Sequence, residues 1–131
     1  MIVVIDQHSG VPVFRQLRDQ IRFQIVSGML EPGEELPSTR SLSEELGLNP
    51  MTISKAYSRL EMEGLVQKRP GLCLVVKELD DADIDTRRLT QFRQSAKSVA
   101  AVAKQLGLSK EMAMEVFAEI LDGADGAKER G

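Results

Sequence analysis

The stretch LGLNPMTISKAYSRLEMEGLV, residues 46–66, predicts a short helix with sharply defined ends. Gly47 lies just before the helix, and Asn49 can cap its start. Pro50 suits the first turn, where a missing N–H costs nothing, and Gly64 can end the helix. The residues expected to face inward are Ile53, Ala56, Tyr57 and Leu60. The outer face is left with hydroxyls and cations.

A second helix is predicted immediately before this one, over the stretch STRSLSEEL. Ser38 is its N-cap candidate, Leu42 and Leu46 face inward, and Gly47 ends it. Two helices joined by a short turn that contains glycine form a helix-turn-helix unit. The stretch that follows, LVQKRPGLCLVV, has two β-rich runs around a Pro-Gly pair and predicts a hairpin. Together these elements predict a winged helix-turn-helix.

A longer helix is expected earlier in the chain, with Pro12 in its first turn and Gly28 at its end. Apolar residues recur there at spacings of three to four. They are Val13, Phe14, Leu17, Ile21, Ile25 and Val26. The preceding MIVVI predicts a short extended piece, and the following LEPGEELP is typical of a turn.

The chain after Lys77 changes character. The acidic ELDDADID predicts a linker and a helix entry. Two helices follow, separated by a break at Gly107, with Ser109 as the cap of the second. The first has a heptad-like apolar row and the second a broad apolar face. The residues expected to dimerise are Leu89, Phe92, Ala96, Val99, Ala103, Leu106, Met112, Val116, Phe117 and Ile120.

The expected fold class is therefore mainly α with a small β-hairpin. A winged helix-turn-helix DNA-binding domain is predicted over residues 1–77, and a two-helix dimerisation segment over 78–123. Residues 124–131 are expected to be a flexible tail.

Composition argues against several classes of protein. The longest apolar runs are too short to span a bilayer, and the N-terminus does not resemble a signal peptide. One Cys excludes an intrachain disulfide and fits a reducing cytoplasm. One His and one Cys provide neither a metal-ligand spacing nor a nucleophile–base pair, so we expect no cofactor and no enzymatic activity. The net charge is −3, yet residues 40–77 carry six cations and four anions, hence +2, which suits phosphate contacts.

The second helix of such a unit enters the major groove with its N-terminus first. In this chain that end carries Asn49, Met51, Thr52 and Lys55. Thr and Asn can meet base edges, Met can touch a thymine methyl, and Lys can reach guanine or phosphate. The sequence thus predicts that duplex DNA is the partner.

The motifs PVFRQL, IVSGMLEPGEELPSTR, LGLNPMTISKAYSRLE and EGLV resemble the DNA-binding domain of GntR-family bacterial transcription regulators. The resemblance covers residues 11–76. It departs at the wing, where many members have Gly-x-Gly-Thr-Phe-Val and this chain has PGLCLVV. Only 54 residues remain after Lys77. A C-terminal part of this length with two helices resembles the YtrA-type subfamily, in which the two helices dimerise.

The resemblance implies that Arg40 contacts the operator and that Gly71, beside Arg69 and Pro70, approaches the minor groove. The start of the recognition helix is expected to contact bases. The full set of predicted DNA-binding residues is Ser38, Thr39, Arg40, Asn49, Pro50, Met51, Thr52, Ser54, Lys55, Arg59, Lys68, Arg69 and Gly71.

The predicted function is a cytoplasmic, homodimeric repressor of transcription that binds an inverted repeat. A small molecule or partner would regulate it by changing the angle between the two winged helices through a connector over residues 78–90. The alternative is a winged helix that contacts another protein and binds no DNA, which the neutral charge of residues 1–77 favours.

Two further features have competing interpretations. Arg87, Arg88, Arg93 and Lys97 could bind an anion, although a solvated helix face is the commoner explanation. Cys73 could sense redox state, but in the apolar run LCLVV a thiol is usually inert packing.

Overall fold

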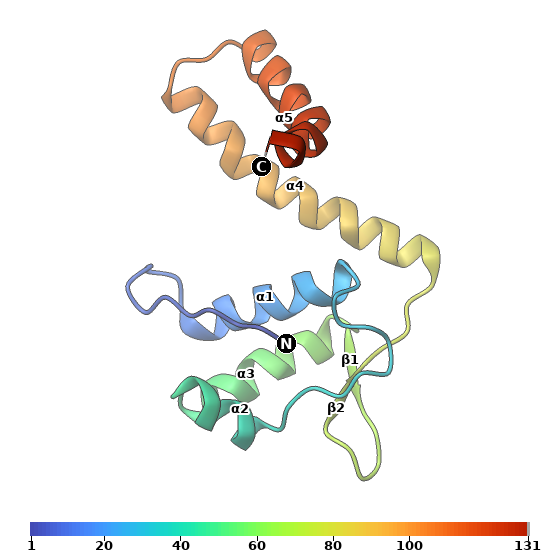
Figure 1. Ribbon diagram of the computed structural model, residues 1–131. Coiled ribbons are helices and arrows are strands. Elements are labelled where there is room, and N and C mark those ends of the chain that lie inside the picture. Colours follow the sequence, from blue (N-terminus) through green and yellow to red (C-terminus); the bar gives the residue numbers. More distant parts are fainter. Residues whose placement is uncertain (131) are drawn as a thin grey trace. The chain divides into compact units, whose positions relative to one another are not determined.

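The structure, a computed structural model, describes the backbone of residues 1–130 and the side chains of residues 1–123. The chain forms two compact units, Met1–Gln91 and a second that begins at Phe92. The elements in order are α1 (Val13–Val26), α2 (Thr39–Leu46), α3 (Pro50–Met62), β1 (Val66–Lys68), β2 (Leu74–Val76), α4 (Asp81–Gln105) and α5 (Lys110–Arg130) (Figure 1). The predicted fold class, mainly helical with one hairpin, is confirmed. None of the described helices is both long and apolar enough to pass through a bilayer.

The core of the first unit lies where α1 packs along α3 (Figure 1). Leu17 and Ile21 from α1 are fully buried, as are Ile53 and Leu60 from α3. Each such side chain contributes about 1.5–3 kcal/mol when it leaves water. The helical spacings in the sequence therefore identified the correct inward faces. The hairpin closes the core with Leu65, Val66, Leu74 and Val76.

Capping interactions define the ends of α2 and α3 as the sequence predicts. The Ser38 hydroxyl accepts a hydrogen bond from the Ser41 N–H at 3.0 Å, and the Asn49 Oδ1 accepts one from the Met51 N–H at 2.8 Å. Gly47 has φ 66°, in the left-handed region where a Cβ is unfavourable. The turn is thus closed by residues whose types the local geometry requires.

A buried serine, which sequence analysis did not single out, also holds this turn together. The Ser43 hydroxyl donates a hydrogen bond to the Leu48 carbonyl, and the Leu48 N–H donates to the Ser43 carbonyl at 3.1 Å. The two bonds join the last turn of α2 to the segment before α3. They fix the angle at which α3 leaves the turn.

The predicted hairpin is confirmed, with an antiparallel register that pairs Val66 with Val76 and Lys68 with Leu74. The segment expected only as a turn, LEPGEELP, adds a third partner. Glu35 forms a β-bridge with Val75, and the Leu36 N–H donates to the Leu74 carbonyl at 2.8 Å. The isolated sequence gives no sign of this pairing because it is a long-range contact.

The N-terminal segment is extended as predicted, but side chains rather than a sheet hold it. The Gln20 side chain accepts from the Val4 N–H at 2.8 Å and donates to the Val4 carbonyl at 2.6 Å. Gln16 makes the equivalent pair of bonds with Asp6, at 2.9 and 2.7 Å. These glutamines are four residues apart, so they share one face of α1. The segment is therefore fixed along that helix.

The first compact unit extends beyond the predicted boundary at Lys77. The acidic stretch contains a connection over residues 78–80 and then the helix entry, because α4 begins at Asp81. The Asp80 carboxylate accepts the Asp83 N–H at 2.8 Å and so caps this start. Most of the connector expected over 78–90 is thus the first turns of α4, and these turns belong to the first unit.

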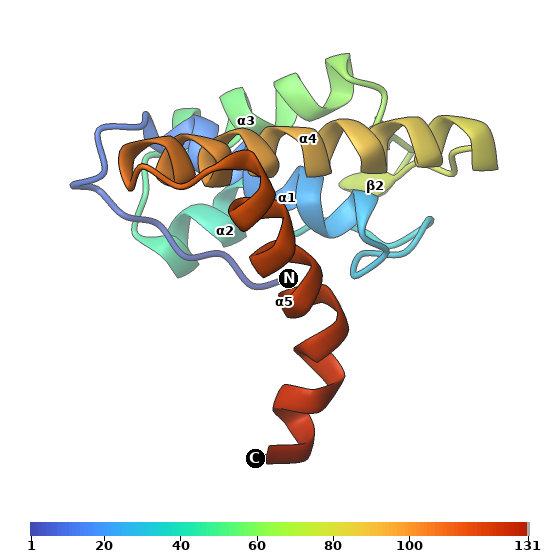
Figure 2. The same cartoon turned by 90° about the horizontal axis from the view of Figure 1, so that it is seen from above.

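The second unit consists of the remainder of α4 and of α5, which runs at an angle to α4 after the intervening turn (Figure 2). The predicted break and cap are confirmed: Gly107 has φ 71°, and the Ser109 hydroxyl accepts the Met112 N–H at 3.1 Å. The Phe92 and Phe117 rings lie 6.3 Å apart between their centroids. The flexible tail expected at 124–131 falls on residue 131 and on α5 residues whose side chains are not described, and it stays a prediction.

Replacing Gly47 by Ala should lower the free energy of unfolding by about 1–2 kcal/mol, because the left-handed conformation penalises a Cβ. A steric clash does not add to this cost, since no neighbouring atom lies within 4 Å of the added Cβ. Urea denaturation of both proteins measures the difference. Gly47→Asn is the matched control and should lose less, since Asn tolerates this region. Equal stability of the parent and the Ala variant would contradict the argument.

Candidate nucleic-acid interface

The outer face at the start of α3 is open to solvent. Met51 is 78% exposed, Ser54 and Lys55 are exposed, and Thr52 is half-buried. The opposite face of the helix is fixed in the core by Ile53. A helix N-terminus with free outer side chains is the arrangement that reads base edges in a major groove.

Phe14, at the start of α1, lies beneath two of the predicted DNA-contacting cations. The Lys55 Nζ is 4.1 Å from the centroid of its ring, and the Arg59 Cζ is 5.8 Å from it. Cation–π attraction at such distances orients a long side chain that would otherwise move freely. Sequence analysis assigned Phe14 only to the inward face of α1, since no spacing rule connects it to residues 55 and 59.

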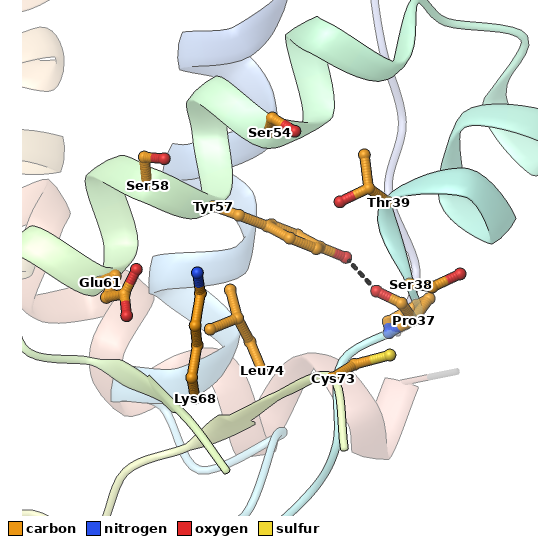
Figure 3. A pocket seen from close by; sticks show the side chains of 10 residues that line it. All are labelled: Pro37, Ser38, Thr39, Ser54, Tyr57, Ser58, Glu61, Lys68, Cys73 and Leu74. Carbon is orange, nitrogen blue, oxygen red and sulfur yellow. Dashed lines mark hydrogen bonds between the residues drawn. The ribbon is translucent and has the colours of Figure 1, made fainter. Parts of the chain in front are cut away.

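A cavity of about 350 Å³ lies between the start of α2, α3 and the hairpin (Figure 3). It brings together Ser38, Thr39, Ser54 and Lys68, four of the predicted DNA-binding residues. Met51, Thr52 and Lys55 line a separate groove beside Phe14. Arg69 and Gly71 line neither hollow and lie at the hairpin turn, where the Leu72 N–H donates to the Arg69 carbonyl at 3.1 Å.

Tyr57 crosses this cavity from α3 and donates its hydroxyl to the Pro37 carbonyl at 2.8 Å (Figure 3). Its ring is buried, as the inward prediction requires. Burial raises the pKa of the Tyr57 hydroxyl well above its usual value, and the nearby Cys73 and Glu45 raise it further. The group therefore stays a neutral donor at physiological pH and ties α3 to the segment that leads into α2.

Arg40 is a highly exposed charged candidate, with 89% of its side chain accessible. Its Nε lies 3.3 Å from the Glu44 Oε1, one turn further along α2. An exposed pair of this kind contributes about 0–1 kcal/mol, so the guanidinium can leave it for a phosphate at little cost.

The hairpin is anchored by a carboxylate. The Cys73 N–H donates to the Glu35 Oε2 at 2.6 Å, which ties the start of β2 to the bridged segment. Partial burial, and then the Glu35 carboxylate, raise the pKa of the Cys73 thiol. The neutral thiol is therefore favoured, which is the opposite of what a reactive redox sensor requires.

Comparison with known proteins identifies the family of the chain. Residues 14–76 match the family of bacterial regulatory proteins named gntR. The HTH-type transcriptional regulator Rv1152 of Mycobacterium tuberculosis is 32% identical over 118 residues, which cover 90% of this chain and 93% of that protein. The chain belongs to the GntR family. Members of this family are DNA-binding transcription regulators, not enzymes.

Similarity over nearly the full length places this GntR protein with the YtrA-type regulators. The HTH-type transcriptional repressor YtrA of Bacillus subtilis is 29% identical over 97% of this chain and 98% of its own. A GntR family transcriptional regulator from Listeria monocytogenes superposes with a TM-score of 0.71, at 27% identity, over 85% of this chain and 96% of that one. YtrA from Sulfolobus acidocaldarius gives a TM-score of 0.56 at 28% identity, over 94% and 99% of the two chains.

Phe14→Leu should weaken duplex binding about two- to fivefold, because a Leu fills the space but has no ring face to orient the cations of Lys55 and Arg59. Fluorescence anisotropy with a labelled duplex measures the loss. Phe14→Tyr keeps the ring and should bind like the parent. If the Leu variant also binds like the parent, the ring does not orient these side chains for DNA.

Cys73 should react with iodoacetamide more slowly than free cysteine at pH 8, since its raised pKa leaves less thiolate at that pH. The rate should climb as the pH passes 9 and beyond. Glu35→Gln removes the nearby charge and should accelerate the reaction, whereas Glu34→Gln should not. A parent thiol that reacts as fast as free cysteine would disprove this assignment.

Proposed function

We propose that this GntR-family regulator binds an inverted-repeat operator as a homodimer and represses transcription. The observation that carries the proposal is the capped α3 helix, whose polar N-terminal face is exposed beside a hairpin wing. Each α3 enters a major groove, and the half-site centres lie about one or two helical turns apart, at roughly 10 bp per turn.

Base recognition is assigned to the first turns of α3. Asn49 and Thr52 offer hydrogen bonds to base edges, and Met51 offers an apolar contact to a thymine methyl. Asn49 also caps the helix through its Oδ1, which leaves its two amide N–H groups and one oxygen lone pair for a base. Thr52 and Met51 have no capping role, so we assign most of the proposed discrimination to them.

Phosphate contacts come from cations around this helix. Arg40 at the start of α2, Lys55 on α3, and Lys68 and Arg69 on the hairpin are all exposed. Neutralising phosphates releases counterions, so affinity should fall steeply with salt. The wing tip, with Gly71 at φ 76°, approaches the minor groove in this arrangement.

Dimerisation is assigned to α4 and α5 because their apolar side chains stay accessible within one chain. No residue of α4 is buried, and Phe92, Val99 and Leu106 are 53%, 59% and 70% exposed. On α5, Met112, Val116 and Ile120 are 48%, 40% and 61% exposed. A soluble monomer seldom leaves so many large apolar side chains in water. A palindromic site also requires a protein with two-fold symmetry.

The relatives support the proposed direction of regulation, and the proposed activity supports the proposed location. Bacillus subtilis YtrA is named a transcriptional repressor, which supports repression here. A regulator of bacterial transcription acts at the chromosome, so we place the protein in the cytoplasm.

A winged helix that contacts only another protein is the competing function, and the equal numbers of cations and anions in residues 1–77 favour it. Retardation of a generic duplex that weakens with salt distinguishes the two, because only a phosphate-binding surface produces it.

Selection of bound sequences from a random duplex pool, followed by sizing of the complex, tests the proposal. Enrichment of an inverted repeat bound by two chains is the expected result. Binding of an inverted repeat by one chain would contradict the dimer. The absence of any duplex binding would leave the protein-contact function as the better one.

Arg40→Ala should weaken binding to every duplex, because its contact is to phosphate. Thr52→Ala should weaken the selected site by about 1–3 kcal/mol and relax one base preference. Titrations against the selected site and a scrambled duplex measure both effects, with Arg93→Ala as a control for loss of one cation. Parental binding by both variants would refute the docking geometry.

A further inference from the structure

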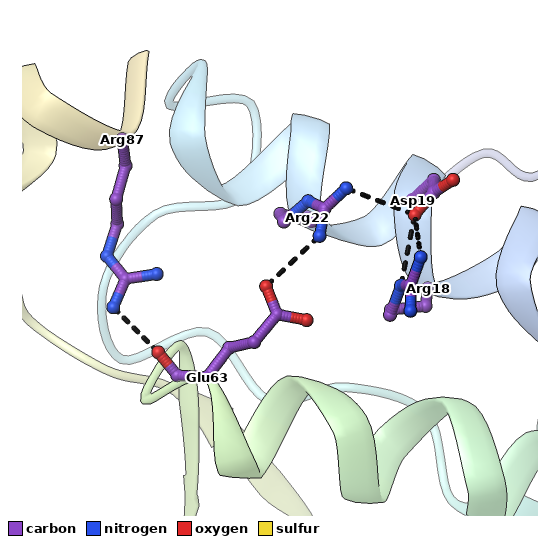
Figure 4. A network of polar contacts seen from close by, with 5 residues as sticks. All are labelled: Arg18, Asp19, Arg22, Glu63 and Arg87. Carbon is purple, nitrogen blue, oxygen red and sulfur yellow. Dashed lines mark hydrogen bonds and ion pairs between the residues drawn. The ribbon is translucent and has the colours of Figure 1, made fainter. Parts of the chain in front are cut away.

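Two arginines on the first turns of α4 reach the ends of two other helices. The Arg87 Nη2 donates to the Glu63 carbonyl, at the end of α3, at 2.6 Å (Figure 4). The Arg88 Nε donates to the carbonyl of Val26, the last residue of α1, at 3.0 Å. The sequence suggested anion binding or a solvated face for these arginines; in the structure each also donates to a helix-end carbonyl, while Arg88 stays exposed.

Both acceptors are groups that need such a partner. The last four carbonyls of a helix have no N–H partner within the helix, and that end of the helix carries partial negative charge. A guanidinium there satisfies the carbonyl and the helix dipole together. Gly64, at φ 77°, turns the chain away after α3, and the position of its absent Cβ lies 3.7 Å from the Arg87 Nη2. The guanidinium therefore lies within van der Waals distance of the turn that ends α3.

Arg87 is itself held in place, and so is the helix end that it reaches. Its Nε lies 3.2 Å from the Asp83 carboxylate, one turn earlier on α4. The Glu63 carboxylate pairs with Arg22 of α1 at 3.1 Å, and Arg22 pairs with Asp19 at 3.1 Å (Figure 4). The end of α3 is thus joined to α1 through a side chain and to α4 through a carbonyl.

Apolar packing at this joint is sparse, so the arginines carry much of the attachment. A cavity of about 120 Å³ lies beside Arg88, between the end of α1, the end of β2 and the start of α4. Leu79 and Ile84 line it and are only half-buried. A joint with half-buried apolar side chains and a hollow beside it loosens when its polar bonds are removed.

We infer that Arg87 and Arg88 are positioning residues that clamp α4 to the recognition helix and to α1, and so set which operator spacing the dimer accepts. This inference rests on the proposed function. Because α4 is one helix from Asp81 to Gln105, its attachment to α3 governs the orientation of each recognition helix in a dimer built from α4 and α5. A hinge over residues 78–90, as the sequence suggested, requires the clamp to open first.

The test compares the double variant Arg87→Gln/Arg88→Gln with the parent. Arg93→Gln/Lys97→Gln is the matched control, since it removes two cations from the same helix beyond the clamp. Two quantities are measured for each protein. The first is amide hydrogen exchange over residues 84–91. The second is the affinity for three duplexes: a single half-site, the operator at the selected spacing, and an operator with its half-sites about 5 bp further apart. The added 5 bp place the two half-sites on opposite faces of the duplex.

Removal of the clamp should accelerate amide exchange over residues 84–91 roughly tenfold, because a helix end without tertiary contacts frays in water. Half-site affinity should stay within about twofold of the parent. The parent and the control should prefer the selected spacing by about tenfold or more, and the double variant by less than about threefold.

Exchange in the double variant that matches the control would overturn the clamp. Faster exchange with the spacing preference intact would overturn the positioning role. Failure of the parent to bind any duplex would refute the proposed function instead, and the exchange measurement would then decide the clamp without DNA.

Discussion

The packing of α3 along α1 is the constraint on which the rest of the molecule depends. Ile53 and Leu60 are fully buried against Leu17 and Ile21, so α3 cannot rotate about its axis without exposing them to water. Because the rotation is fixed, the residues on the opposite side must face outward. The same apolar spacing that builds the core therefore selects the side chains that are available to DNA. Stability and recognition are consequences of a single helical register.

Both ends of α3 are also fixed, each by different chemistry. At the start, the Asn49 cap and the Ser43 bonds across the turn set the entry of the helix. In the middle, Tyr57 ties it to the segment before α2. At the end, the Glu63 carbonyl accepts from Arg87. A helix that must insert into a groove gains from this arrangement, since a misplacement of its axis moves every base contact at once.

Sequence predicted what local chemistry determines. The caps at Ser38 and Asn49, the turn at Gly47, the hairpin and the break at Gly107 all follow from residue types at short spacings, and all are confirmed. Long-range contacts could not be predicted from residue types at short spacings. The pairing of Glu35 with Val75, the ring beneath Lys55 and the extension of the first unit into α4 join residues that no periodicity relates. The DNA-contacting roles of the candidate residues remain predictions, although the structure brings several of them together around one cavity.

The central claim is that the start of α3, and not its end, meets DNA. Two methionines on this helix allow a direct comparison, since Met51 is 78% exposed near its start and Met62 is 80% exposed at its end. A thiol-linked photocrosslinker at Met51→Cys or Met62→Cys, in a chain carrying Cys73→Ser, would be irradiated with the selected operator. Crosslinks to operator bases from position 51 and none from position 62 are predicted. Crosslinks of equal yield from both positions, or chiefly from position 62, would contradict the account.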